Sequence, residues 1–187
     1  MESIFKTAIA KHKDALKSLE ENYQTIQEIA QLFSGALNNK GKIIFLGNGG
    51  SAADAQHLAA ELVGRFKKER IPLASIALNT NTSIITAVGN DYGFDSIFAR
   101  QIEALANPSD IVVGISTSGK SKNVIKAIEK AKELGLKTVG ILGRDGGDLK
   151  GLVDIDLTIF SPDTPQIQEI HILAGHIICE IVEQSLG

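Results

Sequence analysis

The sequence has one cysteine and no long hydrophobic run. Because Cys179 has no partner in the chain, no intrachain disulfide can form and nothing points to an oxidising compartment. The segment from Met1 to Lys6 lacks the basic start and apolar stretch of a signal peptide, and no run approaches the roughly 18 apolar residues of a membrane span. We therefore expect a cytoplasmic protein that does not enter a membrane.

The chain also lacks an excess of positive charge. Its 22 acidic and 19 basic side chains give a net charge of -3. Nucleic acids and anionic lipids are held mainly through their phosphates, so this balance argues against both as partners. With 43% hydrophobic and 22% charged residues, a chain of 187 residues can bury a core without a metal or disulfide. This length predicts a single domain, residues 1–187.

Hydrophobic periodicity predicts helices at both ends of the chain. Apolar side chains recur every three or four residues from Ser3 to about Leu37, which indicates one long helix or two helices with a break at Asn22. The cluster at residues 38–41 supplies the stop. The segment over residues 165–186 predicts one long amphipathic helix.

Between these helices, short apolar runs alternate with helical stretches. Near-continuous Val, Ile and Leu runs separated by helices are typical of a parallel sheet that is covered on both faces. We therefore predict an α/β fold: a three-layer αβα sandwich with a five-stranded parallel sheet over residues 41–187, preceded by helices over residues 1–40. The predicted strands are residues 43–46, 73–78, 111–115, 138–142 and 155–160.

The loop after the first predicted strand, Gly47-Asn48-Gly49-Gly50-Ser51, opens an alanine-rich helix. Backbone N–H groups and the positive end of the helix dipole converge there, so a phosphate would fit. Ser51 with Asp54 also matches a capping box, which needs no ligand, and the two interpretations are compatible. The loop matches a dinucleotide fingerprint as well, but the second predicted strand ends at Leu78-Asn79 without the acidic residue that such a site requires.

The loop after the third predicted strand, residues 114–121, has the P-loop pattern G-x-x-x-x-G-K-S. A P-loop NTPase also needs a Walker-B aspartate for magnesium, and the strand over residues 138–142 ends in Gly143 instead. Ligands of open α/β sheets bind at the carboxyl ends of the strands, so the two loops predict one small ligand, a sugar phosphate rather than a nucleotide. The hydroxyl groups that form a neutral donor cup for its phosphate belong to Ser116, Thr117, Ser118 and Ser121.

Two helices carry the remaining candidate side chains. His57 and Glu61 are four residues apart and share a helix face, which suits either a metal pair or, alternatively, an ion pair between Glu61 and Arg65. The last helix carries Gln168 and His176 among branched apolar residues. Polar groups in such surroundings are exposed, paired or functional.

Five ordered blocks of the sequence carry a resemblance. They are G-N-G-G-S-A-A-D-A-Q-H-L-A-A-E-L from Gly47, V-G-N-D-Y-G-F-D from Val88, G-I-S-T-S-G-K-S from Gly114, G-R-D-G-G from Gly143, and I-Q-E-I-H from Ile167 with His176 five residues later. On these blocks the chain resembles the bacterial phosphoheptose isomerases of the sugar isomerase (SIS) domain superfamily, over essentially its whole length.

The resemblance implies a flavodoxin-like, doubly wound SIS fold and an aldose-ketose isomerase. The reaction would convert sedoheptulose 7-phosphate to D-glycero-D-manno-heptose 7-phosphate through an enediol. The enzyme would be a cytoplasmic homotetramer with active sites at subunit interfaces, and the helices over residues 1–40 would serve oligomerisation. Glu61 would be the general base and His176 its acid/base partner, and a zinc ion would be held by His57, Glu61, Gln168 and His176. The substrate would contact Asn48, Gly49, Gly50, Ser51, Glu61, Asn90, Asp91, Ser116, Thr117, Ser118, Ser121 and Gln168.

Two other functions stay open on the sequence. One is a non-catalytic regulator of the same fold that binds the replication initiator DnaA. Such a protein can lose the catalytic carboxylate and histidine, and because both Glu61 and His176 are present here, the enzyme is favoured. The other is an isomerase for a different sugar phosphate, since donor loops recognise a phosphate well but chain length poorly.

Overall fold

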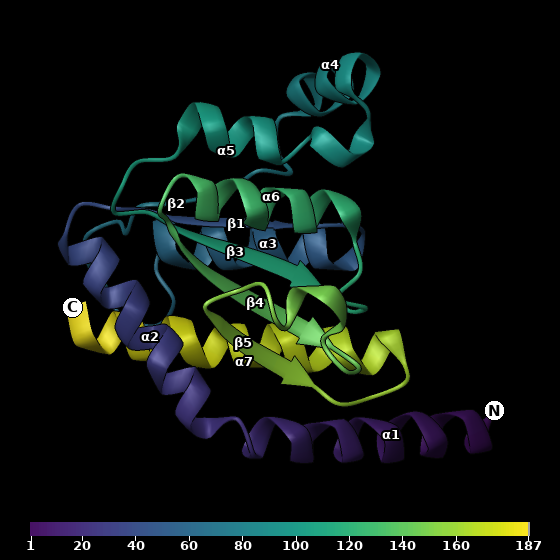
Figure 1. Cartoon of the computed structure of the whole chain (residues 1–187). Coiled ribbons are helices and arrows are strands. Elements are labelled where there is room, and N and C mark those ends of the chain that lie inside the picture. Colours follow the sequence, from purple (N-terminus) through teal and green to yellow (C-terminus); the bar gives the residue numbers. More distant parts are fainter. Residues whose placement is uncertain (187) are drawn as a thin grey trace.

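The computed structural model describes residues 1–186, and Gly187, the last residue of the predicted domain, lies outside the described residues. Five parallel strands form one sheet in the order β2-β1-β3-β4-β5 (Figure 1). The predicted α/β fold with a five-stranded parallel sheet is therefore confirmed. The strands are β1 (Ile43–Gly47), β2 (Ser75–Ala77), β3 (Ile111–Ser116), β4 (Lys137–Gly143) and β5 (Ile155–Ile159).

The edge strand β2 is shorter than its predicted extent of residues 73–78. Leu73 leaves the ladder because its N–H donates to the carbonyl oxygen of Leu62 at the end of a helix. The apolar run over residues 73–78 is buried partly by helix packing and partly by strand pairing. Hydrophobicity in the sequence does not distinguish these two causes of burial.

Helices precede, connect and follow the strands. The predicted break at Asn22 is confirmed, because its side-chain amide donates to the carbonyl oxygens of Ser18 and Thr158 at 2.7 and 3.3 Å and turns the chain against β5. No helix between residues 1 and 186 is both long enough and apolar enough for a membrane span. The α-helices are α1 (Glu2–Glu20), α2 (Tyr23–Asn38), α3 (Gly50–Val63), α4 (Thr82–Tyr92), α5 (Ala99–Leu105), α6 (Lys122–Glu133) and α7 (Thr164–Leu186), and the 3-10 helices are η1 (Phe94–Ser96) and η2 (Gly147–Leu149).

Helices cover both faces of the sheet. Successive side chains of a strand point to opposite faces, and on β3 Val113 packs with α2, α3 and α7 while Val112 packs with α5 and α6. All six residues of β3 are buried. The three-layer αβα arrangement follows from this division of the core into two clusters (Figure 1).

The strand order reverses next to β1. The chain runs from β1 outward to β2 and then returns to β3 on the other side of β1. Such a switch point leaves a crevice beyond the carboxyl ends of the two inner strands. The turn after β1 is tight, because a Cβ on Gly47 would lie 2.7 Å from the carbonyl oxygen of Ser51, and Gly49 has a φ of 58°. The N-terminus of α3 therefore lies at this crevice.

Two helices carry apolar side chains that the chain itself leaves exposed. On α1, which projects beyond the sheet (Figure 1), Ile4 and Phe5 are 75% and 68% exposed. Helix α4 contains no buried residue, although Ile85 and Val88 pack partly against the α5 and α6 side of the core. Both helices have apolar surface available for contacts outside this chain.

Candidate active site

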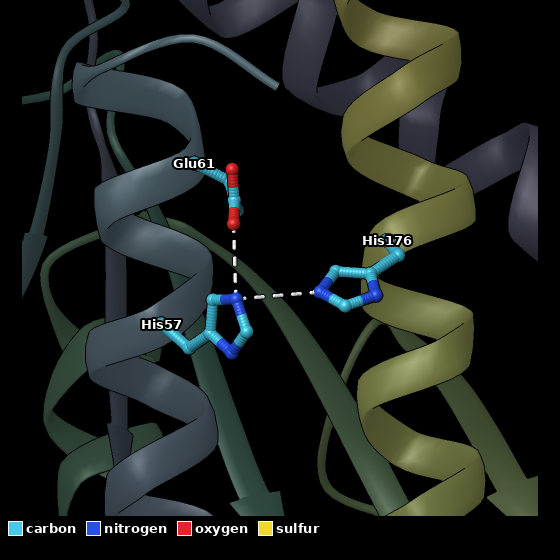
Figure 2. A group of neighbouring side chains, drawn as sticks. All are labelled: His57, Glu61 and His176. Carbon is cyan, nitrogen blue, oxygen red and sulfur yellow. Dashed lines mark hydrogen bonds and ion pairs between the residues drawn. The ribbon is translucent and has the colours of Figure 1, made fainter. Parts of the chain in front are cut away.

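Two packed helices, α3 and α7, bring three ionisable side chains together (Figure 2). His57 and Glu61 are one turn apart on α3, and the Nε2 atom of His57 lies 2.9 Å from Oε1 of Glu61. His176 on α7 places its Nε2 atom 3.4 Å from the same nitrogen of His57. The structure thus brings the predicted base, its predicted partner and His57 into one cluster, which we call the triad.

The close approach of the two helices depends on Gly175, the residue before His176. A Cβ on Gly175 would lie 2.4 Å from Cδ2 of Leu58, far inside the roughly 3.5–4.0 Å at which carbon atoms pack. Leu58 follows His57 in the sequence and is buried. The missing side chain lets the backbone of α7 approach α3, so that His176 reaches His57.

The alternative in which Glu61 pairs with Arg65 is wrong. The carboxylate of Glu61 faces His57 instead. Arg65 lies beyond the end of α3, and its Nε atom is 3.9 Å from the carboxylate of Glu69.

The predicted capping box of Ser51 and Asp54 is also wrong. Helix α3 begins at Gly50 with Gly49 at the N-cap position and no side-chain cap, so Ser51 lies inside the first turn and not before it. Oδ2 of Asp54 is buried without a hydrogen-bond partner. Burial raises the pKa of Asp54 to about 6, although the nearby His57 opposes the shift.

The surroundings of His176 favour its neutral form. Partial burial lowers the pKa of His176, the charge of His57 lowers it further, and Glu61 opposes both. Neutral imidazole and carboxylate are ligands that zinc accepts, and three protein ligands leave a position open for water or substrate. The potential ligand atoms of His57, Glu61 and His176 all lie within 4.8 Å of one another. The three side chains therefore fit a single divalent metal ion.

The two predicted phosphate loops meet at the carboxyl ends of β1 and β3. The amide of Asn48 donates to Oδ1 of Asn123 at 2.8 Å and accepts from Nδ2 of Asn123 at 2.9 Å. In the second loop, the Oγ atoms of Ser116 and Ser121 are 3.1 Å apart, and Ser116 also accepts from the N–H of Gly119. We call this group of amides and hydroxyls at the crevice the phosphate cup.

Asn123 was not among the predicted site residues. It lies in the first turn of α6, where a polar residue is ordinarily a solvated helix start. It is 2% exposed here because its amide pairs with a side chain 75 residues earlier. In the sequence, only its position just after the Ser-rich loop indicated that Asn123 belongs to the site.

Gln168 lies beside the phosphate cup, at a distance from the triad. A Cβ on Gly50 would lie 2.3 Å from Nε2 of Gln168. Gly50 is the first residue of α3, and His57 follows seven residues later, a rise of about 10 Å along the helix. Within one chain this position suits the predicted substrate contact, and the predicted metal contact of Gln168 stays a prediction.

Asn90 and Asp91 lie on a different face of the molecule from the triad. Both side chains are exposed at the end of α4, where Nδ2 of Asn90 donates to Asp91 at 2.8 Å. Helix α4 packs with α5 and α6, whereas α3 and α7 cover the opposite face of the sheet. One chain alone does not bring these two residues to His57, Glu61 and His176.

Comparison with known proteins agrees with this architecture. The sequence pattern of the SIS domain family matches residues 9–143, and the fold and the paired loops define the chain as a SIS-domain protein. A phosphoheptose isomerase from Geotalea daltonii is 56% identical over 182 residues, which cover 97% of this chain and 95% of the relative. One from Helicobacter pylori strain P12 is 55% identical over 177 residues, covering 94% and 92%.

A solved structure gives the same result in three dimensions. The phosphoheptose isomerase GmhA from Neisseria gonorrhoeae matches with a TM-score of 0.92 and 41% sequence identity over 98% of both chains. The chain belongs to the phosphoheptose isomerase family, as the five sequence blocks predicted. A non-catalytic regulator is not favoured.

Proposed function

We propose that this chain interconverts sedoheptulose 7-phosphate and D-glycero-D-manno-heptose 7-phosphate. The observation that carries the proposal is the convergence of Glu61, His57 and His176 on the same two helices that border the phosphate cup. The cup would hold the phosphate, and the triad would meet the reacting carbons. Because His57 is about 10 Å along α3 from the cup, a ligand of several carbons is needed to reach both.

The triad has the groups that the chemistry requires. An aldose-ketose isomerisation moves a proton between adjacent carbons through an enediol, which needs a base at the carbon and a proton shuttle at the oxygens. In our proposal Glu61 removes the proton from one carbon and returns it to the neighbouring carbon, and the contact with His57, whose Nε2 atom lies 2.9 Å from Oε1, orients its carboxylate. His176, whose pKa is lowered by burial, is neutral near pH 7 and can accept a hydroxyl proton and return it to the neighbouring oxygen.

We also propose that the metal is zinc. His57, Glu61 and His176 would hold it, and Gln168, the expected fourth ligand, would come from a second copy of the chain, because within one chain it lies beside the phosphate cup. When bound, zinc would stabilise the negative charge that develops on the sugar oxygens.

Substrate contacts are proposed from two parts of the chain. Those near the cup and triad would be made by Asn48, Gly49, Gly50, Ser51, Glu61, Ser116, Thr117, Ser118, Ser121 and Gln168. Asn90 and Asp91 would contact substrate bound to a second copy of the chain, because they lie across the sheet from their own triad.

Assembly as a homotetramer with interface active sites is part of the proposal. The exposed apolar side chains of α1 and the lack of buried residues on α4 support contacts between copies. We propose a cytoplasmic enzyme, since Cys179 is buried and unpaired. An active monomer in analytical ultracentrifugation would contradict the interface sites.

The proposed reaction can be tested directly. Purified protein is incubated with sedoheptulose 7-phosphate and the anomeric proton of the aldose is followed by NMR, with five-carbon and six-carbon ketose phosphates as comparison substrates. We expect the heptose to turn over fastest. Faster conversion of a shorter sugar would assign a different sugar phosphate, and no product with or without added zinc would refute an isomerase.

A further inference from the structure

A buried ion pair joins the segment after α3 to α7 behind the triad. Nε of Arg70 donates to Oε1 of Glu183 at 3.1 Å, and the two side chains are only 2% and 1% exposed. Glu183 follows His176 by seven residues on α7, so it lies on the same stripe of the helix. Neither charged group belongs to the triad.

Arg70 fixes the end of α3 that carries Glu61. Its guanidinium donates to the backbone carbonyl oxygen of Glu61 at 2.8 Å and to that of Leu62 at 2.9 Å. The last carbonyl oxygens of a helix have no partner within the helix. The planar guanidinium supplies those partners in a fixed direction, so the backbone of the proposed base is anchored by Arg70.

Glu183 fixes the segment that bounds His176 from the other side. Its carboxylate accepts hydrogen bonds from the backbone N–H groups of Phe66, Lys67 and Lys68 at 2.9, 2.7 and 2.9 Å. These bonds hold Phe66, whose ring centre lies 5.4 Å from that of His176. Through one backbone contact and one ring contact, the ion pair acts on both proposed catalytic side chains.

Stability alone does not account for this arrangement. Buried ion pairs stabilise a fold poorly, and apolar side chains of similar size often serve as well or better. Apolar side chains cannot make directed bonds to the backbone on both sides of a site. We propose that Arg70 and Glu183 are positioning residues that hold Glu61 and His176 at their working separation, an inference that rests on the catalytic roles proposed above.

The test compares the variant Glu183→Gln with a matched control at another buried carboxylate. Asp110 accepts hydrogen bonds from the backbone N–H groups of Lys42 and Asn107 at 2.8 and 2.7 Å and forms an ion pair with Lys42, at the opposite ends of the strands from the phosphate cup. Both carboxylates thus tie backbone segments together. Asp110→Asn should lower the thermal midpoint and leave kcat unchanged.

For Glu183→Gln we expect kcat to fall by about 10-fold to 100-fold, because misplacement of about 1 Å costs on that order. KM should stay within about threefold, since the phosphate cup is built from other residues. Kinetics are measured well below the thermal midpoint of each variant, with circular dichroism to verify folding. Arg70→Lys keeps the charge but loses the planar fork, so it should show the same loss of kcat.

Phe66→Leu provides a second route if the charge variants do not fold. It keeps the ion pair and removes only the ring beside His176, and we expect a smaller loss of kcat with unchanged KM. A folded Glu183→Gln, Arg70→Lys or Phe66→Leu enzyme with wild-type kcat would overturn the positioning role. Glu61→Gln is measured in parallel: if it stays active, the proposed base is wrong, whereas an inactive Glu61→Gln beside a fully active Glu183→Gln refutes the positioning role alone.

Discussion

Replacing Gly175 by alanine tests whether the closeness of α3 and α7 sets the activity. The added Cβ would lie 2.4 and 2.7 Å from Cδ2 and Cδ1 of Leu58. Carbon atoms pack at about 3.5–4.0 Å, so the overlap is about 1 Å. Because Leu58 is 2% exposed, it has no solvent to move into, and either the helices separate or the leucine takes a strained rotamer.

Two energies oppose one another in the Gly175→Ala protein. Overpacking a core costs about 1–3 kcal/mol. Alanine in a helix is more favourable than glycine by about 1 kcal/mol. The net loss of stability should therefore be only about 0–2 kcal/mol. Separation of the helices by about 1 Å would move His176 away from Glu61, and such a misplacement costs on the order of 100-fold in kcat.

The assay pairs urea denaturation with steady-state kinetics. Gly35→Ala is the control, because Gly35 lies inside α2 and an added Cβ would meet nothing within 4 Å. It should stabilise by about 1 kcal/mol and leave kcat unchanged. Adding Leu58→Val to Gly175→Ala removes the clashing methyl groups and should restore part of kcat. A Gly175→Ala enzyme with wild-type kcat would refute the argument that this contact places His176.

Glu61→Gln should lower kcat by about 10²-fold to 10⁴-fold with little change in KM, as expected for loss of a general base, and near-normal turnover would remove Glu61 from that role. Burial lowers the pKa of His171 to about 4, although its hydrogen bond to the carbonyl oxygen of Leu142 opposes the shift. Between pH 6.5 and 4 the unfolded chain therefore binds a proton that the folded chain does not. The free energy of unfolding should fall by up to about 3 kcal/mol as the pH drops through this range. Thermal midpoints across this range should decline less for His171→Gln, and equal slopes would contradict the assignment. Treatment with a chelator should abolish turnover, and zinc should restore it; full activity in protein that is metal-free by elemental analysis would remove the metal from the mechanism.

The fold was predictable because its determinants are local. Apolar runs such as residues 111–115 are long enough for a strand and too short for a helix, and the cluster of asparagine and glycine residues at positions 38–41 is a typical helix end. The break at Asn22 was predictable on the same basis. The edge strand β2 was predicted too long, because the N–H of Leu73 donates to the carbonyl oxygen of Leu62 at the end of α3 and not to a neighbouring strand.

The candidate site was predictable only in part. Spacing places His57 and Glu61 on one face of a helix, but it does not reveal whether Glu61 contacts His57 or Arg65, and of these two alternatives the pairing with Arg65 was wrong. Spacing also does not reveal His176, which lies 119 residues after His57 in the sequence and contacts it in the structure. Gly175 likewise has no local pattern, since its role comes from the approach of another helix.

The lining of the phosphate cup determines how pH can act on this enzyme. Its side chains, among them Asn48, Ser116, Ser121 and Asn123, end in amides and hydroxyls, which do not ionise between roughly pH 5 and 9. Affinity should then follow only the ligand's own second phosphate ionisation, near a pKa of about 6. Turnover, in contrast, should follow the protonation of His176 in the triad, about 10 Å away, whose pKa is lowered by burial. Binding affinity and turnover would thus depend on separate protonation events, one on the sugar phosphate and the other on the protein.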